Sequence, residues 1–215
     1  MIRILLVDDH ELVRTGFRGI LEGGDPGIEV VGEAKSGEEA LQQVQKLKPD
    51  LVLMDINMPG IGGIEATRKI KRLHPGTNVI AVTIHSRAPF PEQLHEAGAM
   101  GYVSKGCSPD ELFEAIRTVS SGGAFISSDV SRKMTLGMLA GTSPDAPFGK
   151  LSQREMQVLL MITQGSRTQD ISDSLCISPK TVSTYRHRLF EKLSVKSDVE
   201  LTHLALRYGL IGETA

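Results

Sequence analysis

The stretch Pro49-Asp50-Leu51-Val52-Leu53-Met54-Asp55-Ile56-Asn57-Met58-Pro59-Gly60 decides the fold of the N-terminal half of the chain. Leu51–Met54 is a short apolar run between turn-forming residues. This pattern is typical of a buried strand, although periodicity alone does not distinguish it from a buried helical segment. Asp55 follows where the strand ends. Ligands of open α/β sheets bind beyond the carboxyl ends of the strands, so Asp55 is a candidate site residue, with a helix cap as the alternative.

The composition is that of a globular chain of 215 residues, enough for one large or two small domains. No apolar run approaches the roughly 20 residues that span a bilayer. The run Ile4–Val7 is followed by two aspartates, so we expect no signal peptide. Cys107 and Cys176 lie far apart and lack the spacing of metal ligands. These features predict a cytoplasmic protein.

Charge is distributed unevenly along the chain. Residues 1–122 carry 13 basic and 17 acidic side chains, a net charge of −4, whereas residues 148–215 carry 9 and 7, a net charge of +2. In the stretch 180–196, five Lys or Arg residues stand against one Glu. A locally basic stretch on a small domain is a candidate nucleic-acid contact, although such a run is more often a solvated helix face.

The first 122 residues alternate short apolar runs with amphipathic stretches, which predicts a doubly wound α/β domain with a five-stranded parallel sheet. The five expected strands are Ile2–Val7, Glu29–Ala34, Leu51–Met54, Val79–Thr83 and Gly101–Val103. The expected helices begin near Glu11, Gly37, Ile64, Phe90 and Asp110. Right-handed crossovers bring the carboxyl ends of all these strands to one side of the sheet.

Polar side chains follow these strands on that side. Asp8 and Asp9 come after the first strand, Asp55 after the third, Thr83 ends the fourth, and Lys105 follows the fifth. Three carboxylates in one crevice raise one another's pKa values unless a cation neutralises them. Oxygen ligands with room for water and a phosphate suit Mg²⁺. A lysine, a threonine hydroxyl and a cation around one aspartate therefore predict a phosphoryl-transfer site.

This constellation resembles the flavodoxin-like receiver domain of two-component response regulators over roughly residues 1–122. The resemblance implies that Asp55 accepts a phosphoryl group from a sensor histidine kinase. It implies Mg²⁺ as the cofactor, held by Asp9 and Asp55, by Asp8 through water, and by the backbone carbonyl of Asn57.

The same resemblance implies three further residues around the phosphoryl group. Lys105 would pair with it, Thr83 would hydrogen-bond to it, and Tyr102 stands at the aromatic switch position, where a half-buried strand tyrosine is an equally good interpretation. Two residues depart from the family pattern. Gly106 replaces the proline that usually follows the lysine in a cis bond, and Ile84 replaces a residue that is often small. Both departures affect the expected rates and not the expected site.

Two other functions fit part of the pattern. An aspartyl-phosphate phosphohydrolase would also use Asp55 at a strand end. Phosphatases of the haloacid dehalogenase type carry a second aspartate two residues later as general acid, and here that residue is Asn57. A phosphorylation-independent regulator with a structural receiver should have lost Asp8, Asp9, Asp55 or Lys105, and all four are present. We therefore expect a regulator and not an enzyme.

Residues 123–147 have the character of a linker. The stretch 127–140 predicts a short helix with Val130, Met134 and Met138 along one stripe, which should pack against a domain. The stretch 141–147 has the composition of a flexible joint.

Residues 148–211 are rich in helical periodicity, which predicts a small all-α domain. Ser152-Gln153-Arg154-Glu155 is a capping box that opens the first helix, and Gly165 ends it. Gln169–Leu175 is the second helix, and Ser178-Pro179 opens the third. A fourth helix is expected over Asp198–Tyr208.

The third helix has one apolar and one polar face. The apolar positions are Val182, Tyr185, Leu189 and Leu193. The opposite face carries Lys180, Ser183, Thr184, His187 and Glu191. Two short helices joined by a turn, the second exposing basic and small polar side chains, are typical of a helix-turn-helix that binds double-stranded DNA. The alternative is a solvated helix in a small bundle.

The stretches 151–155, 177–182 and 192–195 resemble the LuxR-type DNA-binding domain over about 148–211. The resemblance makes 179–194 the recognition helix. Its implied base-reading residues are Ser183, Thr184 and His187, and its implied phosphate contacts are Lys180, Thr181, Arg186 and Arg188. The last helix would be the dimer contact through Leu201, Leu204 and Ala205, giving a homodimer in the active state.

A receiver at 1–122, a linker at 123–147 and a LuxR-type domain at 148–211 is the arrangement of the NarL/FixJ family. The stretches 178–182, 190–201 and 88–91 resemble the GacA/UvrY branch of that family in particular. This resemblance implies a sensor kinase of the BarA/GacS type as partner and promoters of small regulatory RNAs as targets. Phosphorylation of Asp55 should then control transcription.

Overall fold

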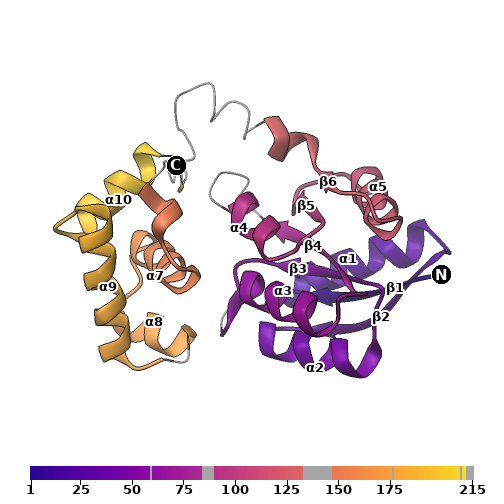
Figure 1. Cartoon of the computed structure of the whole chain (residues 1–215), viewed down its shortest axis with the longest axis horizontal. Helices are drawn as coiled ribbons and strands as arrows, with labels where there is room; N and C mark the ends of the chain where they lie inside the picture. The colour runs from indigo at the N-terminus through magenta and orange to yellow at the C-terminus, as the bar shows by residue number, and fades with distance from the viewer. Residues whose placement is uncertain (59, 84–89, 133–146, 176, 209, 212–215) are drawn as a thin grey trace. The chain divides into compact units, whose positions relative to one another are not determined.

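In the computed structural model of the chain, the run Leu51–Asp55 forms strand β3 inside a parallel sheet (Figure 1). All five residues are buried, as expected for a strand covered by helices on both faces. The structure describes all residues except 59, 84–89, 133–146, 176, 209 and 212–215. The described residues divide into two compact units, an N-terminal one within residues 1–132 and a C-terminal one within residues 147–211.

The sheet of the N-terminal unit contains six strands in the order β2-β1-β3-β4-β5-β6. The other strands are β1 (Ile2–Val7), β2 (Ile28–Ala34), β4 (Asn78–Thr83), β5 (Gly101–Ser104) and β6 (Phe125–Ile126). Every pairing is parallel, so the strands end on the same side of the sheet. The doubly wound parallel architecture is therefore confirmed.

Helices cover both faces of this sheet (Figure 1). They are α1 (Glu11–Gly24), α2 (Gly37–Leu47), α3 (Gly62–Leu73), α4 (Phe90–Glu96) and α5 (Pro109–Ser120). Side chains alternate between the faces along a strand, so Ile4 packs with the buried residues of α1 and α5, and Leu5 packs with those of α2 and α3. Two hydrophobic cores result, and together they fix the positions of the strand ends.

The prediction of five strands was wrong by one. The sixth, β6, pairs with β5 through Gly101↔Phe125 and Tyr102↔Ile126. A strand of two residues is too short to show an alternating pattern, and the glycines before it predict only a turn. The pairing arises because the chain leaving α5 returns to the open edge of β5.

The segment after β6 is helical at residues 128–132, where Val130 is fully buried. The rest of the predicted linker helix, including Met134 and Met138, lies outside the described residues, as does most of the predicted joint. Ile84 and Cys176 also lie outside them.

The C-terminal unit is all-α, as predicted. Its elements are the 3₁₀ turn η1 (Pro147–Lys150) and the helices α7 (Gln153–Thr163), α8 (Thr168–Leu175), α9 (Pro179–Leu193) and α10 (Asp198–Arg207). The capping box is complete: Ser152 Oγ accepts from the Glu155 backbone N–H, and the Glu155 carboxylate accepts from the Ser152 backbone N–H. Among the described residues, no helix combines the length and the apolar character that a membrane span requires.

Candidate functional site

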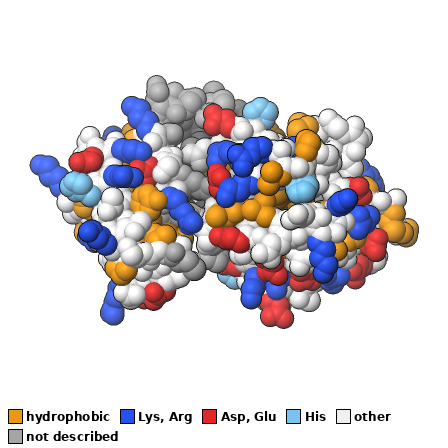
Figure 2. Space-filling model, turned by 60° about the horizontal axis from the view of Figure 1, so that its bottom comes forward, with side chains coloured by type: hydrophobic (Ala, Val, Ile, Leu, Met, Phe, Trp, Pro, Cys, Tyr) orange, Lys and Arg blue, Asp and Glu red, His pale blue; other side chains and the backbone are white. Residues whose placement is uncertain are grey.

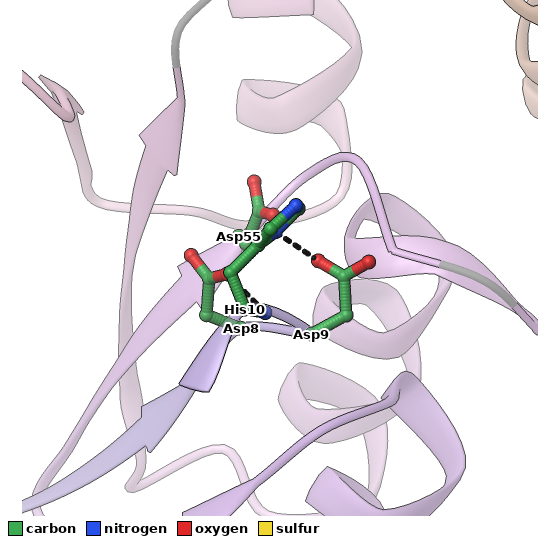
Figure 3. Close-up of side chains that lie close together, drawn as sticks. All are labelled: Asp8, Asp9, His10 and Asp55. Carbon is green, nitrogen blue, oxygen red and sulfur yellow. Dashed lines mark hydrogen bonds and ion pairs between the residues drawn. The ribbon is translucent and has the colours of Figure 1, made fainter. Parts of the chain in front are cut away.

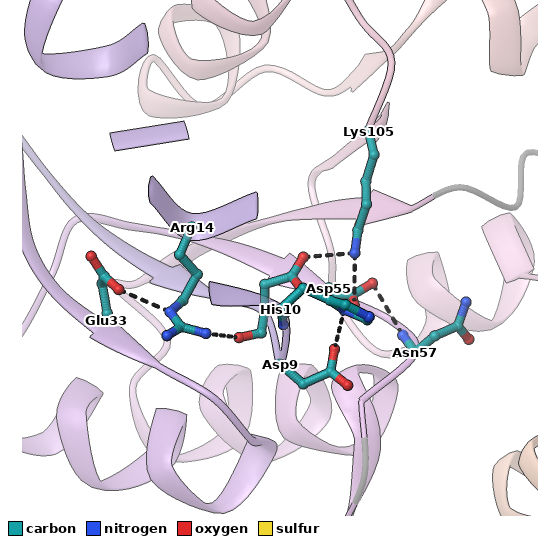
Figure 4. A network of polar contacts seen from close by, with 8 residues as sticks. Asp9, His10, Arg14, Glu33, Asp55, Asn57 and Lys105 are labelled. Carbon is teal, nitrogen blue, oxygen red and sulfur yellow. Dashed lines mark hydrogen bonds and ion pairs between the residues drawn. The ribbon is translucent and has the colours of Figure 1, made fainter. Parts of the chain in front are cut away.

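A lysine bridges two buried carboxylates at the carboxyl end of the sheet (Figure 4). Asp8 directly follows β1, Asp55 is the last residue of β3, and Lys105 follows β5. Lys105 Nζ lies 2.7 Å from Asp8 Oδ2 and 3.0 Å from Asp55 Oδ2. The structure thus brings together three predicted site residues that are up to 97 positions apart in the chain.

Burial controls the protonation of this group. Asp8 is 4% exposed and Asp55 is 2% exposed. Burial raises the pKa of Asp55, the charge of Lys105 opposes that effect, and the charge of Asp8 adds to it, with a net upward shift. Burial alone would lower the pKa of Lys105, but its hydrogen bonds and charge interactions with the two carboxylates raise it. Lys105 therefore remains a cation throughout the neutral range.

A cluster of possible metal ligands surrounds Asp55 (Figure 3). One ligand atom from each of Asp8, Asp9, His10 and Asp55 lies within 4.8 Å of the others. Three carboxylates face a single lysine, so the group retains negative charge. Carboxylate oxygens are the ligands that Mg²⁺ prefers, and the exposed side of the cluster leaves room for water. The residues present therefore fit the predicted Mg²⁺.

His10 is a member of this cluster that the sequence reasoning missed. Its Nδ1 lies 2.9 Å from Asp9 Oδ1, and its backbone N–H donates to Asp8 Oδ1 at 2.9 Å. The only available indication was its position next to the two aspartates. Asn57 is placed as expected beyond β3, where its backbone N–H donates to Asp55 Oδ1 at 3.2 Å. That bond fixes one oxygen of Asp55 while Lys105 holds the other.

Thr83 and Tyr102 form a buried pair on the neighbouring strands. Thr83 ends β4 and is fully buried, and Tyr102 on β5 is 4% exposed. Their side chains share a hydrogen bond. Burial raises the pKa of Tyr102, and the bond to Thr83 only partly opposes this, so the phenol stays neutral. Tyr102 is more deeply buried than the half-buried strand tyrosine that the sequence also allowed.

Asp55→Asn should unfold at a higher urea concentration than the wild type at neutral pH in magnesium-free buffer. The folded-state pKa of Asp55 is raised, so the wild type gains stability when Asp55 is protonated and loses it as the pH rises through that pKa. Asparagine is neutral at every pH. The advantage of the variant should therefore shrink as the pH falls toward the unfolded-state value, which urea titrations followed by circular dichroism would measure. If the difference in stability between Asp55→Asn and the wild type did not change with pH, the pKa of Asp55 would not be raised in the folded protein.

Helix α9 presents the polar face that the sequence predicted. Ser178 caps it by accepting from the Thr181 backbone N–H at 3.1 Å. Val182, Leu189 and Leu193 are buried. The exposed predicted contacts are Lys180, Ser183, Thr184, His187 and Arg188. Figure 2 shows Lys and Arg side chains prevailing over Asp and Glu on the visible face of the C-terminal unit.

Several polar groups of α9 also interact within the unit. Ser183 and Thr184 donate their hydroxyl protons to carbonyls four residues earlier, each at 3.0 Å. Arg186 pairs with Asp198 at 2.7 Å and lies 5.6 Å from the ring centroid of Phe190. Arg186 is therefore partly neutralised by its own domain, and it anchors α9 to α10 whatever else it contacts.

Two of the three residues predicted for the dimer contact of α10 lie in the interior of the C-terminal unit. Leu201 and Ala205 are fully buried inside a single chain, where α10 packs against α7. Leu204 is half-buried. The outward side of the same helix carries Val199, which is 64% exposed. An apolar residue every third or fourth position marks one face of a helix but does not say whether that face meets its own core or a second chain.

Both halves of the chain match protein-family models. Residues 4–117 match the response regulator receiver domain, and residues 149–205 match the bacterial regulatory proteins of the luxR family. The response regulator GacA of Pseudomonas viridiflava is 52% identical over 215 residues and is covered along its whole length, as is this chain. The response regulator UvrY of Escherichia coli K12 is 51% identical over 210 residues, which are 98% of this chain and 96% of UvrY.

Solved structures of full-length regulators are also similar. RcsB from Salmonella enterica serovar Typhimurium, bound to promoter P1flhDC with the phosphomimetic BeF3⁻, has a TM-score of 0.68 and 26% identity. The match covers 96% of this chain and 98% of RcsB. ChrA, a response regulator of a heme-sensing two-component system, has a TM-score of 0.55 and 30% identity, covering 98% of each chain.

Proposed function

The chain belongs to the response regulators of two-component systems that join a receiver domain to a LuxR-type DNA-binding domain, and we propose that phosphoryl transfer to Asp55 controls its DNA binding. One observation carries the proposal: Asp55 ends β3 with one oxygen on Lys105 and the other on the Asn57 backbone N–H. The carboxylate is thus oriented, partly desolvated and next to a fixed cation. These are the features of an activated carboxylate nucleophile.

In the proposed transfer, an Asp55 oxygen forms the new bond to phosphorus. The bond between phosphorus and the histidine nitrogen of the kinase breaks, and its electron pair stays on that nitrogen. Lys105 neutralises charge on the phosphoryl oxygens, which is how such sites accelerate transfer. Asp9 and Asp55, with Asp8 through water and the Asn57 carbonyl, would hold a Mg²⁺ that supplies further charge neutralisation.

The buried Thr83–Tyr102 pair is the proposed route from the phosphoryl group to the rest of the receiver. A phosphoryl group adds negative charge and strong hydrogen-bond acceptors next to the end of β4. Thr83 would turn its hydroxyl to that group, and Tyr102 would follow because the two side chains share a hydrogen bond. This movement of Thr83 and Tyr102 defines two states of the receiver. It changes DNA binding only if the free energy of DNA binding differs between these two states.

For DNA binding we propose that α9 enters the major groove. The residues that would read bases are Ser183, Thr184 and His187. The residues that would contact phosphates are Lys180, Thr181, Arg188 and Arg186, the last while it remains paired with Asp198. The active form would be a homodimer through α10, where Leu204 is the residue of the predicted contact that stays partly exposed. The DNA-bound RcsB structures, one of which contains RcsB dimers, support this choice.

The proposed partner is a sensor histidine kinase of the BarA/GacS type, and the proposed location is the cytoplasm. The GacA and UvrY relatives, at about half identity along the whole chain, support this choice. Promoters of small regulatory RNAs are the proposed targets.

The test is DNA binding with and without a small phosphodonor and Mg²⁺, at one fixed salt concentration. The phosphodonor should tighten binding of the wild type by roughly 5- to 150-fold, the usual range of allosteric coupling, and should leave Asp55→Asn unchanged. Fluorescence anisotropy on a promoter library measures both. Lys180→Ala is the control. It should weaken DNA binding equally with and without phosphodonor, and it should lower the slope of log affinity against log salt concentration by about one, the value for one lost phosphate contact. Equal, phosphodonor-independent binding by wild type and Asp55→Asn would refute the proposal.

A further inference from the structure

Asp8 is hydrogen-bonded at each of its polar atoms. Its backbone N–H donates to the Ala34 carbonyl at 3.1 Å. Its two carboxylate oxygens accept from the His10 backbone N–H at 2.9 Å and from Lys105 at 2.7 Å. Its carbonyl oxygen accepts from Arg14 Nη1 at 2.8 Å (Figure 4). Arg14, the donor of this last bond, takes no part in the proposed phosphoryl transfer.

Arg14 is itself held on two elements. It lies on α1 with a side chain only 14% exposed, and its Nε donates to Glu33 Oε2 on β2 at 2.8 Å. The hydrogen bond from Arg14 lowers the pKa of Glu33 against the opposing effect of burial, so Glu33 stays ionised at neutral pH. A planar guanidinium that donates in two directions at once keeps a defined orientation. Arg14 thus ties the loop after β1 to β2.

The Asp8 carbonyl belongs to the planar peptide unit that joins Asp8 to Asp9. Fixing this oxygen therefore fixes the direction in which the chain continues to Asp9. The Asp8 carboxylate is held by other bonds. The more exposed Asp9, with 29% of its side chain accessible, contacts His10 Nδ1 at 2.9 Å, and the position of its backbone is set by this peptide.

We propose that Arg14 is a positioning residue for the cation site: it orients the Asp8–Asp9 peptide so that both carboxylates face Asp55. The inference rests on the proposed function, because it assumes that this cluster binds Mg²⁺. Outer-shell partners of metal ligands typically contribute a factor of 10 to 100 in metal affinity. Arg14 is such a partner, acting through the main chain and not through a ligand side chain.

Arg18 is a matched control within the same ion-pair network. Its Nε donates to the other oxygen of Glu33 at 2.9 Å, and its Nη1 donates to Glu22 at 2.8 Å. Arg14→Gln and Arg18→Gln each remove one cation from Glu33, but only the first removes a donor from the Asp8 carbonyl. A purely structural role would affect both variants similarly.

The experiment is Mg²⁺ titration calorimetry on the full chain without phosphodonor, for wild type, Arg14→Gln, Arg18→Gln and Asp9→Asn. Arg14→Gln should weaken Mg²⁺ binding by about tenfold or more, Arg18→Gln by less than about twofold, and Asp9→Asn should abolish it. Thermal unfolding in EDTA checks that both arginine variants fold. Labelling of Asp55 by phosphodonor should be slow in Arg14→Gln at low Mg²⁺ and recover at saturating Mg²⁺.

The possible results distinguish the role of Arg14 from the existence of the Mg²⁺ site. Equal Mg²⁺ affinity in Arg14→Gln and Arg18→Gln, with Asp9→Asn impaired, overturns the role of Arg14 and leaves the proposed function intact. A labelling defect in Arg14→Gln that saturating Mg²⁺ does not restore also overturns it. Wild type that binds no Mg²⁺, or binds it independently of Asp9, overturns the cation site and the role of Arg14 with it.

Discussion

Lys105→Met should lower the free energy of unfolding by about 3–5 kcal/mol in magnesium-free buffer at neutral pH, the usual loss when one partner of a buried ion pair is removed. Lys105 Nζ is within 3.0 Å of both Asp8 and Asp55, and both aspartates are less than 5% exposed as whole residues. Methionine keeps most of the length of the side chain and removes its charge. Two like charges would then face each other in a buried site, and the pKa of Asp55 would rise further.

Urea unfolding of Lys105→Met is best followed by far-UV circular dichroism, since the chain contains no Trp. Lys35→Met is the control, because Lys35 is exposed and such a change usually alters stability by less than about 0.5 kcal/mol. Mg²⁺ should restore part of the loss in Lys105→Met, because a ligand that binds only the folded state stabilises it. If Lys105→Met lowered the free energy of unfolding no more than Lys35→Met does, Lys105 would not offset the repulsion between the buried carboxylates.

Gly63→Ala should destabilise the N-terminal unit by about 3 kcal/mol, at the upper end of the usual cost of overpacking. A Cβ at Gly63 would lie 2.0 Å from the Asp55 carbonyl oxygen and 2.8 Å from the Ile56 Cα. Both are backbone atoms and cannot rotate away. The Gly63 backbone N–H donates to the Ile56 carbonyl at 3.1 Å, so the start of α3 is held against the end of β3. Any relief of the clash must move β3 or α3.

Gly16→Ala provides the control for Gly63→Ala, since it adds the same methyl group. Gly16 lies in α1, and a Cβ there would meet nothing within 4 Å. Alanine at an exposed helix position is more stable than glycine by about 1 kcal/mol, so this variant should gain stability. Urea unfolding should therefore give opposite signs for the two variants. Gly63→Ala as stable as the wild type would mean that α3 and β3 separate without cost.

The sequence alone determined the parts of this protein that depend on local pattern. The uninterrupted apolar run of β3 predicted a buried strand, and right-handed connections between parallel strands predicted that Asp8, Asp55 and Lys105 lie on one side of the sheet. The caps at Ser152 and Ser178 predicted where α7 and α9 begin, because a serine cap and its partner are only three residues apart. The resemblance to the GacA/UvrY branch is confirmed by relatives at about half identity over the whole chain.

The tertiary structure alone decided features that depend on segments distant in the chain. The two-residue strand β6 forms because an open edge of β5 is available to it, and not because of its own pattern. The inward face of α10 at Leu201 and Ala205 is chosen by the packing of α7. Arg14 donates to both the Asp8 carbonyl and Glu33, and the pairing of β1 with β2 brings these two acceptors together. A local sequence pattern reflects the conformation and burial that its residues favour. These contacts depend instead on which distant segments the fold brings next to a residue.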